Sequence, residues 1–181
     1  METKILIIPG LGGSGDNHWQ TYWSKNFNKA IRIEQENWDE PELPKWLEKL
    51  NEAIEQIHEP VILVAHSLAV SLVLHWAVKH NNNNIKGALL VAPADVDSAD
   101  YTPDVVRGFA PIPTTKLSFP SIVVTSINDP YISLNRAKYF AEQWGSEFIN
   151  IGEKGHINSD SNLGMWEEGQ MILQRLNSYN E

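Results

Sequence analysis

A serine that could act as a nucleophile lies where an apolar run passes directly into a helical pattern. The run Val61–Ala65 is typical of a buried strand and Leu68 opens the next segment, so Ser67 falls on the turn between them. Such a turn exposes a serine hydroxyl above a sheet and aims the following amide, that of Leu68, at a developing oxyanion. Alanine stands two residues before and after Ser67, where glycine is more usual. The alternative interpretation is a serine that only caps a helix.

A histidine and an aspartate follow two later predicted strands. His156 comes shortly after the last apolar run, and Asp129 follows the run before it. Because the carboxyl ends of parallel strands meet at one edge of a sheet, we expect both side chains near Ser67. The chain order Ser, Asp, His is that of an α/β-hydrolase triad, in which the histidine removes the serine proton and the carboxylate orients the histidine. Asp95, after another strand, is the alternative acid, although its acidic neighbours favour a solvated loop.

The glycine-rich loop after the first apolar run fits the same chemistry. It would bring the N–H of Leu11 opposite the N–H of Leu68 and so complete an oxyanion hole. The glycines of this loop would allow the close approach that this role needs. The predicted oxyanion hole is therefore made of two main-chain amides, those of Leu11 and Leu68.

The same loop also has the letters of a dinucleotide-binding motif, Gly-x-Gly-x-x-Gly, at Gly10, Gly12 and Gly15. Glu34 lies at nearly the distance of a ribose-binding acid. Asp16 delays the following helix, however, and would repel a pyrophosphate. The nucleotide interpretation also leaves the Ser, Asp, His set unexplained, so we expect no cofactor.

Four residues near these turns are candidates for lining a pocket: Gly12, His18, Trp19 and His66. For His18 the alternative is a hydrogen bond at the surface, and for Trp19 it is core packing beside Trp23. His66 directly precedes the nucleophile, but nothing in its position requires proton transfer, and a structural role is the simpler interpretation. Loop residues at such an edge are often functional.

Composition narrows the classes of function. The 181 residues carry a formal net charge of −9 without a cluster of Lys or Arg, so neither nucleic acid nor an anionic membrane is an expected partner. The lack of cysteine excludes thiolate nucleophiles and disulfides, and the histidines show no metal-ligand spacing. No signal-peptide core or membrane-spanning run is recognisable, so we expect a cytoplasmic protein. The oligomeric state stays open.

Strands and helices alternate along the chain. Strands are predicted at Lys4–Ile8, Ala30–Glu34, Val61–Ala65, Gly87–Val91, Ser121–Thr125 and Glu147–Ile151. Helices are predicted at Leu43–Ile57, Leu68–Lys79, Leu134–Trp144 and Leu163–Leu176. This alternation, with nearly continuous apolar strands, predicts a single α/β domain over residues 1–181, with a six-stranded, mostly parallel sheet and helices on both faces. The proline-containing stretch 94–119 is either a partial lid, which we favour, or a surface loop.

Five motifs together resemble a known family: Pro9-Gly10 with the glycines and His18-Trp19, Ala65-His66-Ser67-Leu68-Ala69, Asn128-Asp129-Pro130, Gly155-His156-Ile157-Asn158 and Gly164-x-Trp166-x-x-Gly169. They resemble the YdeN-like serine hydrolases, the family of retinoblastoma-binding protein nine, over nearly the whole chain. The resemblance implies a compact α/β-hydrolase without a large cap, with Ser67, Asp129 and His156 as the triad. It also implies esterase-type activity on small acyl esters, with amides as a second class. A binding module that keeps the fold and acts through protein contacts is the rival hypothesis.

Overall fold

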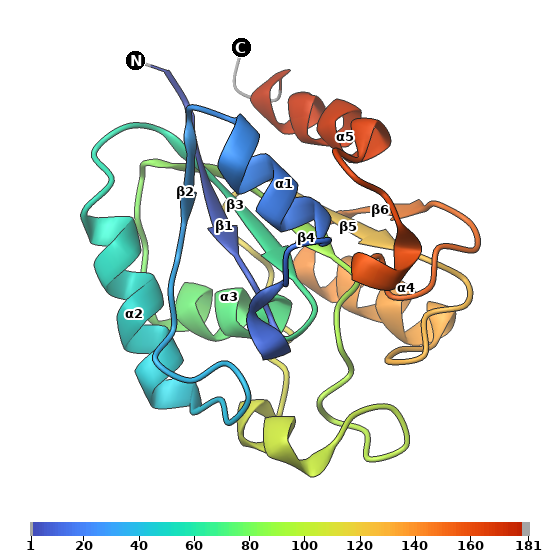
Figure 1. Ribbon diagram of the computed structural model, residues 1–181. Coiled ribbons are helices and arrows are strands. Elements are labelled where there is room, and N and C mark those ends of the chain that lie inside the picture. The colour runs from blue at the N-terminus through green and yellow to red at the C-terminus, as the bar shows by residue number, and fades with distance from the viewer. Residues whose placement is uncertain (1, 179–181) are drawn as a thin grey trace.

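Six parallel strands form one sheet in the computed structural model, which describes residues 2–178 (Figure 1). The strands are β1 (Lys4–Ile8), β2 (Ala30–Arg32), β3 (Val61–His66), β4 (Ile85–Val91), β5 (Ser121–Thr125) and β6 (Glu147–Asn150). Their order across the sheet is β2-β1-β3-β4-β5-β6, and each neighbouring pair is parallel. All carboxyl ends therefore meet at one edge, and the predicted parallel sheet is confirmed.

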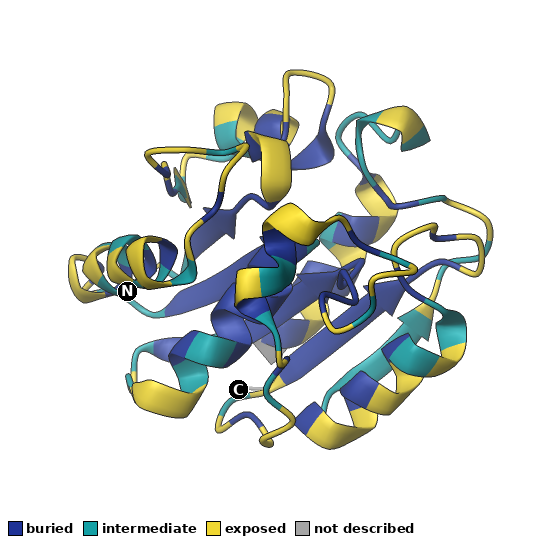
Figure 2. Cartoon of the chain, turned by 90° about the horizontal axis from the view of Figure 1, so that it is seen from below, coloured by how far each residue is buried: buried dark blue, intermediate teal, exposed yellow. Residues whose placement is uncertain are grey.

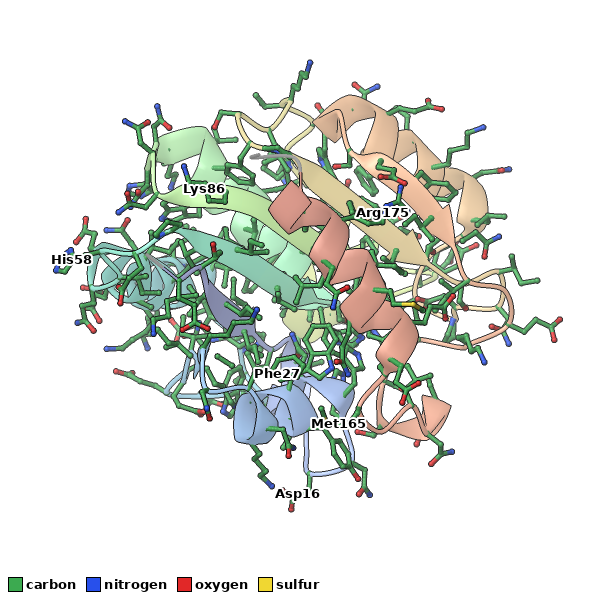
Figure 3. All side chains as sticks on the ribbon, turned by 90° about the horizontal axis from the view of Figure 1, so that it is seen from above. Asp16, Phe27, His58, Lys86, Met165 and Arg175 are labelled. Atoms are coloured by element: carbon green, nitrogen blue, oxygen red, sulfur yellow. The ribbon has the colours of Figure 1, made fainter. Side chains whose placement is uncertain are left out.

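Helices cover both faces of this sheet. They are α1 (Trp19–Asn26), α2 (Leu43–Glu55), α3 (Leu68–Lys79), α4 (Leu134–Trp144) and α5 (Glu167–Ser178), with short 3-10 turns η1 (Leu11–Gly13), η2 (Asp104–Phe109) and η3 (Ser159–Ser161). One apolar cluster joins α2, α3 and α4 to one face, and a second joins α1 and α5 to the other. Viewed from above, α5 crosses the sheet, and Phe27 and Met165 lie over this second face (Figure 3).

The strands sort their side chains between the two clusters by alternation. In β1, Leu6 and Ile8 belong to the first cluster, whereas Ile5 and Ile7 belong to the second. Because both faces are covered, the central strands are apolar at nearly every position, as expected for a parallel sheet. Figure 2 shows these strands buried between helices whose outer turns are exposed. The two apolar clusters thus pack against both faces of the sheet and support the edge at which its strands end.

The last predicted helix begins too early. Residues 163–166 form a turn, and α5 starts at Glu167. Gly164 and Trp166 adopt left-handed φ values of 55° and 41°, which interrupt a helix that the apolar spacing alone predicts. Gly169 then accommodates the indole: a Cβ there would lie 2.2 Å from the Trp166 ring. The tail motif is thus a packing device between this turn and α5.

Other segments also differ in detail from the sequence-based expectation. Helix α1 was not among the predicted helices, β4 begins at Ile85 rather than Gly87, and α2 and β6 end at Glu55 and Asn150 rather than at Ile57 and Ile151. The edge strand β2 ends at Arg32, since it pairs with β1 alone over three residues. The stretch 94–119 is neither wholly a lid nor a wrapped loop. It carries η2 and buries Val96, Phe109 and Leu117 in the first cluster, while other residues of the same stretch form a wall of the cavity described below.

Candidate active site

Ser67 occupies a strained turn between β3 and α3. Its backbone has φ 58° and ψ −122°, a region that residues other than glycine rarely adopt. Its N–H donates to the Val91 carbonyl at 3.0 Å, which ties the turn to the end of β4. Ala65 and Ala69 are fully buried on either side, so small side chains allow strand and helix to meet this closely. The strained conformation of Ser67 is thus held in place by β3, β4 and the first turn of α3.

Gly10 brings the glycine-rich loop against this turn. A Cβ at Gly10 would lie 2.8 Å from the His66 carbonyl oxygen and 3.1 Å from the Leu68 nitrogen. Both contacts are with backbone, which cannot swing aside as a flexible side chain can. Only glycine therefore fits between β1 and the turn at Ser67 without moving one of them.

The amides of Leu11 and Leu68 flank the same cavity as Ser67. Within residues 2–178, neither N–H has a hydrogen-bond acceptor. The next amide along the loop differs, because the Gly12 N–H donates to the Trp38 carbonyl at 3.0 Å. The turn of η1 thus uses the Gly12 amide to hold its shape and leaves the Leu11 amide free. Two unused donors beside a serine hydroxyl are the arrangement that an oxyanion needs.

His156 and Asp129 complete a hydrogen-bonded chain with Ser67. His156 Nε2 lies 2.7 Å from the Ser67 Oγ, and His156 Nδ1 lies 2.9 Å from each carboxylate oxygen of Asp129. The carboxylate side chain is fully buried, and its Oδ1 also accepts the Tyr131 N–H at 2.9 Å. Since an ionised carboxylate only accepts, Nδ1 carries the proton and Nε2 presents a lone pair to the serine hydroxyl. The three side chains predicted from strand ends therefore meet in one place.

Asp95, the alternative acid, lies in a different network. Its Oδ2 accepts from Arg136 Nε at 3.2 Å, and Arg136 also donates to Asp97 at 2.8 Å. Burial raises the pKa of Asp95, while the Arg136 guanidinium opposes that shift. The side chain binds α4 to the end of β4 rather than orienting His156.

His18 and His66 form a buried pair beside His156. Their ring centroids lie 4.6 Å apart, and His66 lies 4.9 Å from His156. His18 caps α1, because its Nδ1 accepts the Gln20 N–H at 3.1 Å. Burial, reinforced by His156 and Arg32, lowers the pKa of His18 to about 3. Burial, with His18 and His156, also holds the pKa of His66 well below its usual value. Both rings are therefore neutral near pH 7.

A cavity of about 270 Å³ opens over Ser67. Gly12, His18 and His66 line it as expected, together with Thr102, Pro103 and Val106 from the 94–119 stretch. Trp19 does not line it. That side chain is buried in the second apolar cluster against Trp23 and Trp166, so core packing is the correct interpretation.

The glycine-rich loop differs from a nucleotide-binding loop in its geometry. Helix α1 begins at Trp19, four residues beyond Gly15, and the His18 side chain already occupies the Gln20 amide at its N-terminus. In a dinucleotide-binding motif this helix would start within the glycines and offer its free amides to the pyrophosphate. Glu34 is exposed and forms an ion pair with Arg32. The glycine-rich loop therefore packs against the turn at Ser67 and does not have the geometry of a nucleotide-binding loop.

The model of the serine hydrolase family matches residues 5–175. The chain belongs to that family. A YdeN-like hydrolase from Pectobacterium atrosepticum is 32% identical, with a TM-score of 0.87, and the match covers 98% of this chain and 92% of the other. YdeN of Bacillus subtilis is 24% identical over 88% of each chain, and its crystal structure gives a TM-score of 0.81 over 98% of this chain and 100% of YdeN.

A more distant likeness shows the fold alone. Est1E from Butyrivibrio proteoclasticus, solved with ferulic acid bound, is 14% identical with a TM-score of 0.73. The match covers 97% of this chain and 90% of Est1E. The family match and the YdeN-like relatives confirm the resemblance seen in the sequence: this serine hydrolase has the α/β-hydrolase fold and a hydrolytic function.

Sequence reasoning missed several residues of the hydrolase site. Tyr131 packs edge-on against His156, with ring centroids 4.5 Å apart, and its N–H orients Asp129. An aspartate that accepts the N–H two residues on forms an Asx turn, so Asn128-Asp129-Pro130 carried a signal for this contact. Asn158 and Ser159 line the cavity without any comparable signal.

The described residues form neither a metal-ligand cluster nor a membrane-spanning helix. Within residues 2–178, no group of three His, Asp or Glu side chains is arranged to hold a metal ion. None of the helices in that range has the length and hydropathy needed to cross a bilayer.

Proposed function

We propose that this serine hydrolase cleaves small acyl esters through an acyl-enzyme formed on Ser67. The observation that carries the proposal is the 2.7 Å contact between His156 Nε2 and the Ser67 Oγ, backed by the buried Asp129. A serine hydroxyl is a weak nucleophile at neutral pH unless an adjacent base accepts its proton. Acyl transfer is the reaction that needs all of these groups together: an activated serine, its base and two free amides for the oxyanion.

The reaction follows from these positions. Ser67 Oγ attacks the ester carbonyl carbon while its proton passes to His156 Nε2, and the carbonyl oxygen becomes an oxyanion. The N–H groups of Leu11 and Leu68 hold that oxyanion. His156 then protonates the leaving alkoxide oxygen as the C–O bond breaks. A water molecule, deprotonated by His156, attacks the acyl carbon and releases the acid, and the proton returns to Ser67.

The size of the cavity supports the choice of small acyl groups. Its volume of about 270 Å³ lies just below the range of roughly 300–1,000 Å³ typical of ligand pockets. Apolar residues of the 94–119 stretch, such as Pro103 and Val106, line one part of it. An acyl chain of a few carbons fits this space, and amides are a second, slower substrate class because an amine is a poorer leaving group.

A fluorophosphonate probe tests the proposal directly. We expect the folded wild-type protein to be labelled and Ser67→Ala to remain unlabelled. Ser71→Ala is the matched control, since Ser71 lies one turn along the same helix and its hydroxyl donates to the Phe109 carbonyl. Labelling that survives Ser67→Ala, or its absence from folded wild type, would contradict the proposal.

Turnover of p-nitrophenyl esters gives the second readout. We expect hydrolysis of acetyl and butyryl esters, and little hydrolysis of dodecanoyl esters, because the cavity has no space for a long chain. Removing Ser67 is expected to lower kcat by about 10⁶-fold, as removal of a triad nucleophile does elsewhere. A preference for long acyl chains would show that the 94–119 stretch moves away from the site.

A further inference from the structure

The loop that carries His156 has little regular structure of its own. Between the end of β6 at Asn150 and the start of α5 at Glu167 it contains only the 3-10 turn η3. Left-handed φ values recur along it, at Gly152, Gly155, Ile157, Asn162, Gly164 and Trp166. Ile157, which directly follows the base, has φ 49°, and this region is costly for a β-branched residue. Such a conformation persists only where surrounding contacts over-determine it.

Two buried side chains supply those contacts at the base itself. His66 Nε2 lies 2.9 Å from the main-chain carbonyl oxygen of His156, and Trp19 Nε1 lies 2.8 Å from that of Ile157. A carbonyl oxygen only accepts, so both ring nitrogens donate. His66 is 4% exposed and Trp19 is 1% exposed, so water does not compete for either bond.

These bonds join the nucleophile and the base by two routes. Ser67 holds the imidazole of His156 through its hydroxyl, while the preceding residue, His66, holds the His156 carbonyl. His66, the last residue of β3, and Ser67, which directly follows it, therefore hold the main chain and the side chain of His156 respectively.

The protonation state of His66 suits this task. Burial, together with His18 and His156, keeps the pKa of His66 well below its usual value, so the ring is neutral and has a single N–H. That N–H is the one donated to the His156 carbonyl. A neutral ring here also avoids placing a positive charge beside His156 when it takes the serine proton.

We propose that His66 and Trp19 are positioning residues, which hold the main chain of His156 and Ile157 by side-chain N–H donation and thereby fix the imidazole against Ser67. The inference rests on the proposed function, because positioning matters only if His156 acts as the base. It gives His66 a role beyond lining the cavity. Trp19 is buried and does not line the cavity, so it would act on the reaction only through the position of the His156 loop.

The main test compares His66→Leu with His66→Gln in p-nitrophenyl acetate hydrolysis. Leucine removes the donor, and we expect kcat to fall by about 10- to 100-fold while KM changes by less than about 2-fold. Glutamine offers an N–H at similar reach, and we expect it to restore kcat to within about 3-fold of wild type. A purely structural role predicts a lower melting temperature for both variants and no such split between kcat and KM.

Trp19→Phe tests the second donor with a control from the same helix. Trp23 also donates an indole N–H to this loop, to the Met165 carbonyl at 2.8 Å, but that carbonyl lies nine residues beyond His156. We expect Trp19→Phe to lower kcat by about 10-fold, because loss of the bond to Ile157 would displace the base from Ser67. We expect Trp23→Phe to leave kcat unchanged, because its bond to Met165 does not hold the base.

The outcomes separate this inference from the function on which it rests. Wild-type protein that neither labels with the fluorophosphonate nor hydrolyses esters would overturn the proposed function, and the inference with it. Active wild type with an unchanged kcat in His66→Leu would overturn the inference alone. Loss of activity that His66→Gln does not restore, or equal losses in Trp19→Phe and Trp23→Phe, would also overturn it.

Discussion

The turn His66–Leu68, which carries the proposed nucleophile (the nucleophile turn), and the loop 151–166, which carries the proposed base (the base loop), reach the same site by opposite means. Ser67 stands on a strained residue between two regular elements, β3 and α3, and its position follows from strand register and the approach of Gly10. His156 stands on a loop with little regular structure, and its position follows from side chains that belong to other parts of the chain. One half of the site is built by backbone packing and the other by individual hydrogen bonds.

This difference sets how each half responds to substitution. The nucleophile turn tolerates no added volume, because the atoms around it are backbone atoms held by the sheet. In the loop that carries His156, a Cβ added at Gly152, Gly155 or Gly164 would meet no atom within 4 Å, although the left-handed φ of each glycine would strain the backbone. Its catalytic position depends instead on hydrogen bonds that each hold one carbonyl or one ring nitrogen. Substitutions that add a methyl group should therefore damage the first region, and isosteric substitutions that change a hydrogen bond should damage the second.

Among changes that keep the catalytic serine, the largest effect is expected for an isosteric substitution of the acid that orients the base. Asp129→Asn presents an amide to His156 Nδ1, which favours the wrong tautomer, and we expect kcat to fall by about 10⁴-fold with little change in melting temperature. Asp95→Asn is the matched control from the alternative acid. It weakens the contact with Arg136 and should change kcat by less than about 3-fold. Steady-state kinetics on a short-chain aryl ester measures both, and a larger loss in Asp95→Asn would reverse the assignment.

An added methyl group should break the nucleophile turn. In Gly10→Ala the new Cβ would meet the His66 carbonyl oxygen and the Leu68 nitrogen, so either β1 or the turn must shift. We expect kcat to fall by about 10²- to 10³-fold, because an oxyanion donor is displaced, and stability to fall by about 1–3 kcal/mol.

Gly15→Ala controls for the loss of a glycine in the same loop. Gly15 has no atom within 4 Å of an added Cβ and no left-handed φ, so kcat and the urea midpoint should stay close to wild type. Equal effects of Gly10→Ala and Gly15→Ala would mean that loop flexibility, rather than close approach, explains the glycines.

The two regions also differ in how far the sequence predicts them. The run Val61–Ala65, the following serine and the helical spacing after it are contiguous, so the elements around Ser67 can be placed from local pattern. Strand ends also placed Asp129 and His156 at the same edge of the sheet. The six strands and four of the five long helices were predicted, with errors of a few residues at several ends.

The supports of the base could not be predicted in the same way. The hydrogen bond from Trp19 to Ile157 spans 138 residues, and the bond from His66 to His156 spans 90. No local pattern reports such a contact, because it depends on how α1 and β3 pack against a loop near the other end of the chain. The early start predicted for α5 has a related cause: apolar spacing continues through Trp166, but the left-handed turn there is set by tertiary packing on Gly169.

The smallest expected effect concerns His18, which lies beside both regions. Its pKa is about 3 in the folded protein against a usual 6.5, with burial as the main cause. Between these values the unfolded chain binds a proton that the folded protein excludes. Above about pH 6.5 the buried, neutral His18 costs no stability. As the pH falls below that value, the free energy of unfolding decreases by up to about 1.4 kcal/mol per pH unit.

His18→Asn should remove this pH dependence and keep the helix cap. Asparagine can still accept the Gln20 N–H at the start of α1, so stability near pH 7 should change little. Between pH 6.5 and 5, wild type should lose about 2 kcal/mol more than the variant in urea unfolding, while His66 keeps a residual slope in both. Exposed His58→Asn controls for the removal of one imidazole. Parallel stability curves for wild type and His18→Asn would show that the folded protein admits a proton at His18, and that the site is more open to water than its burial indicates.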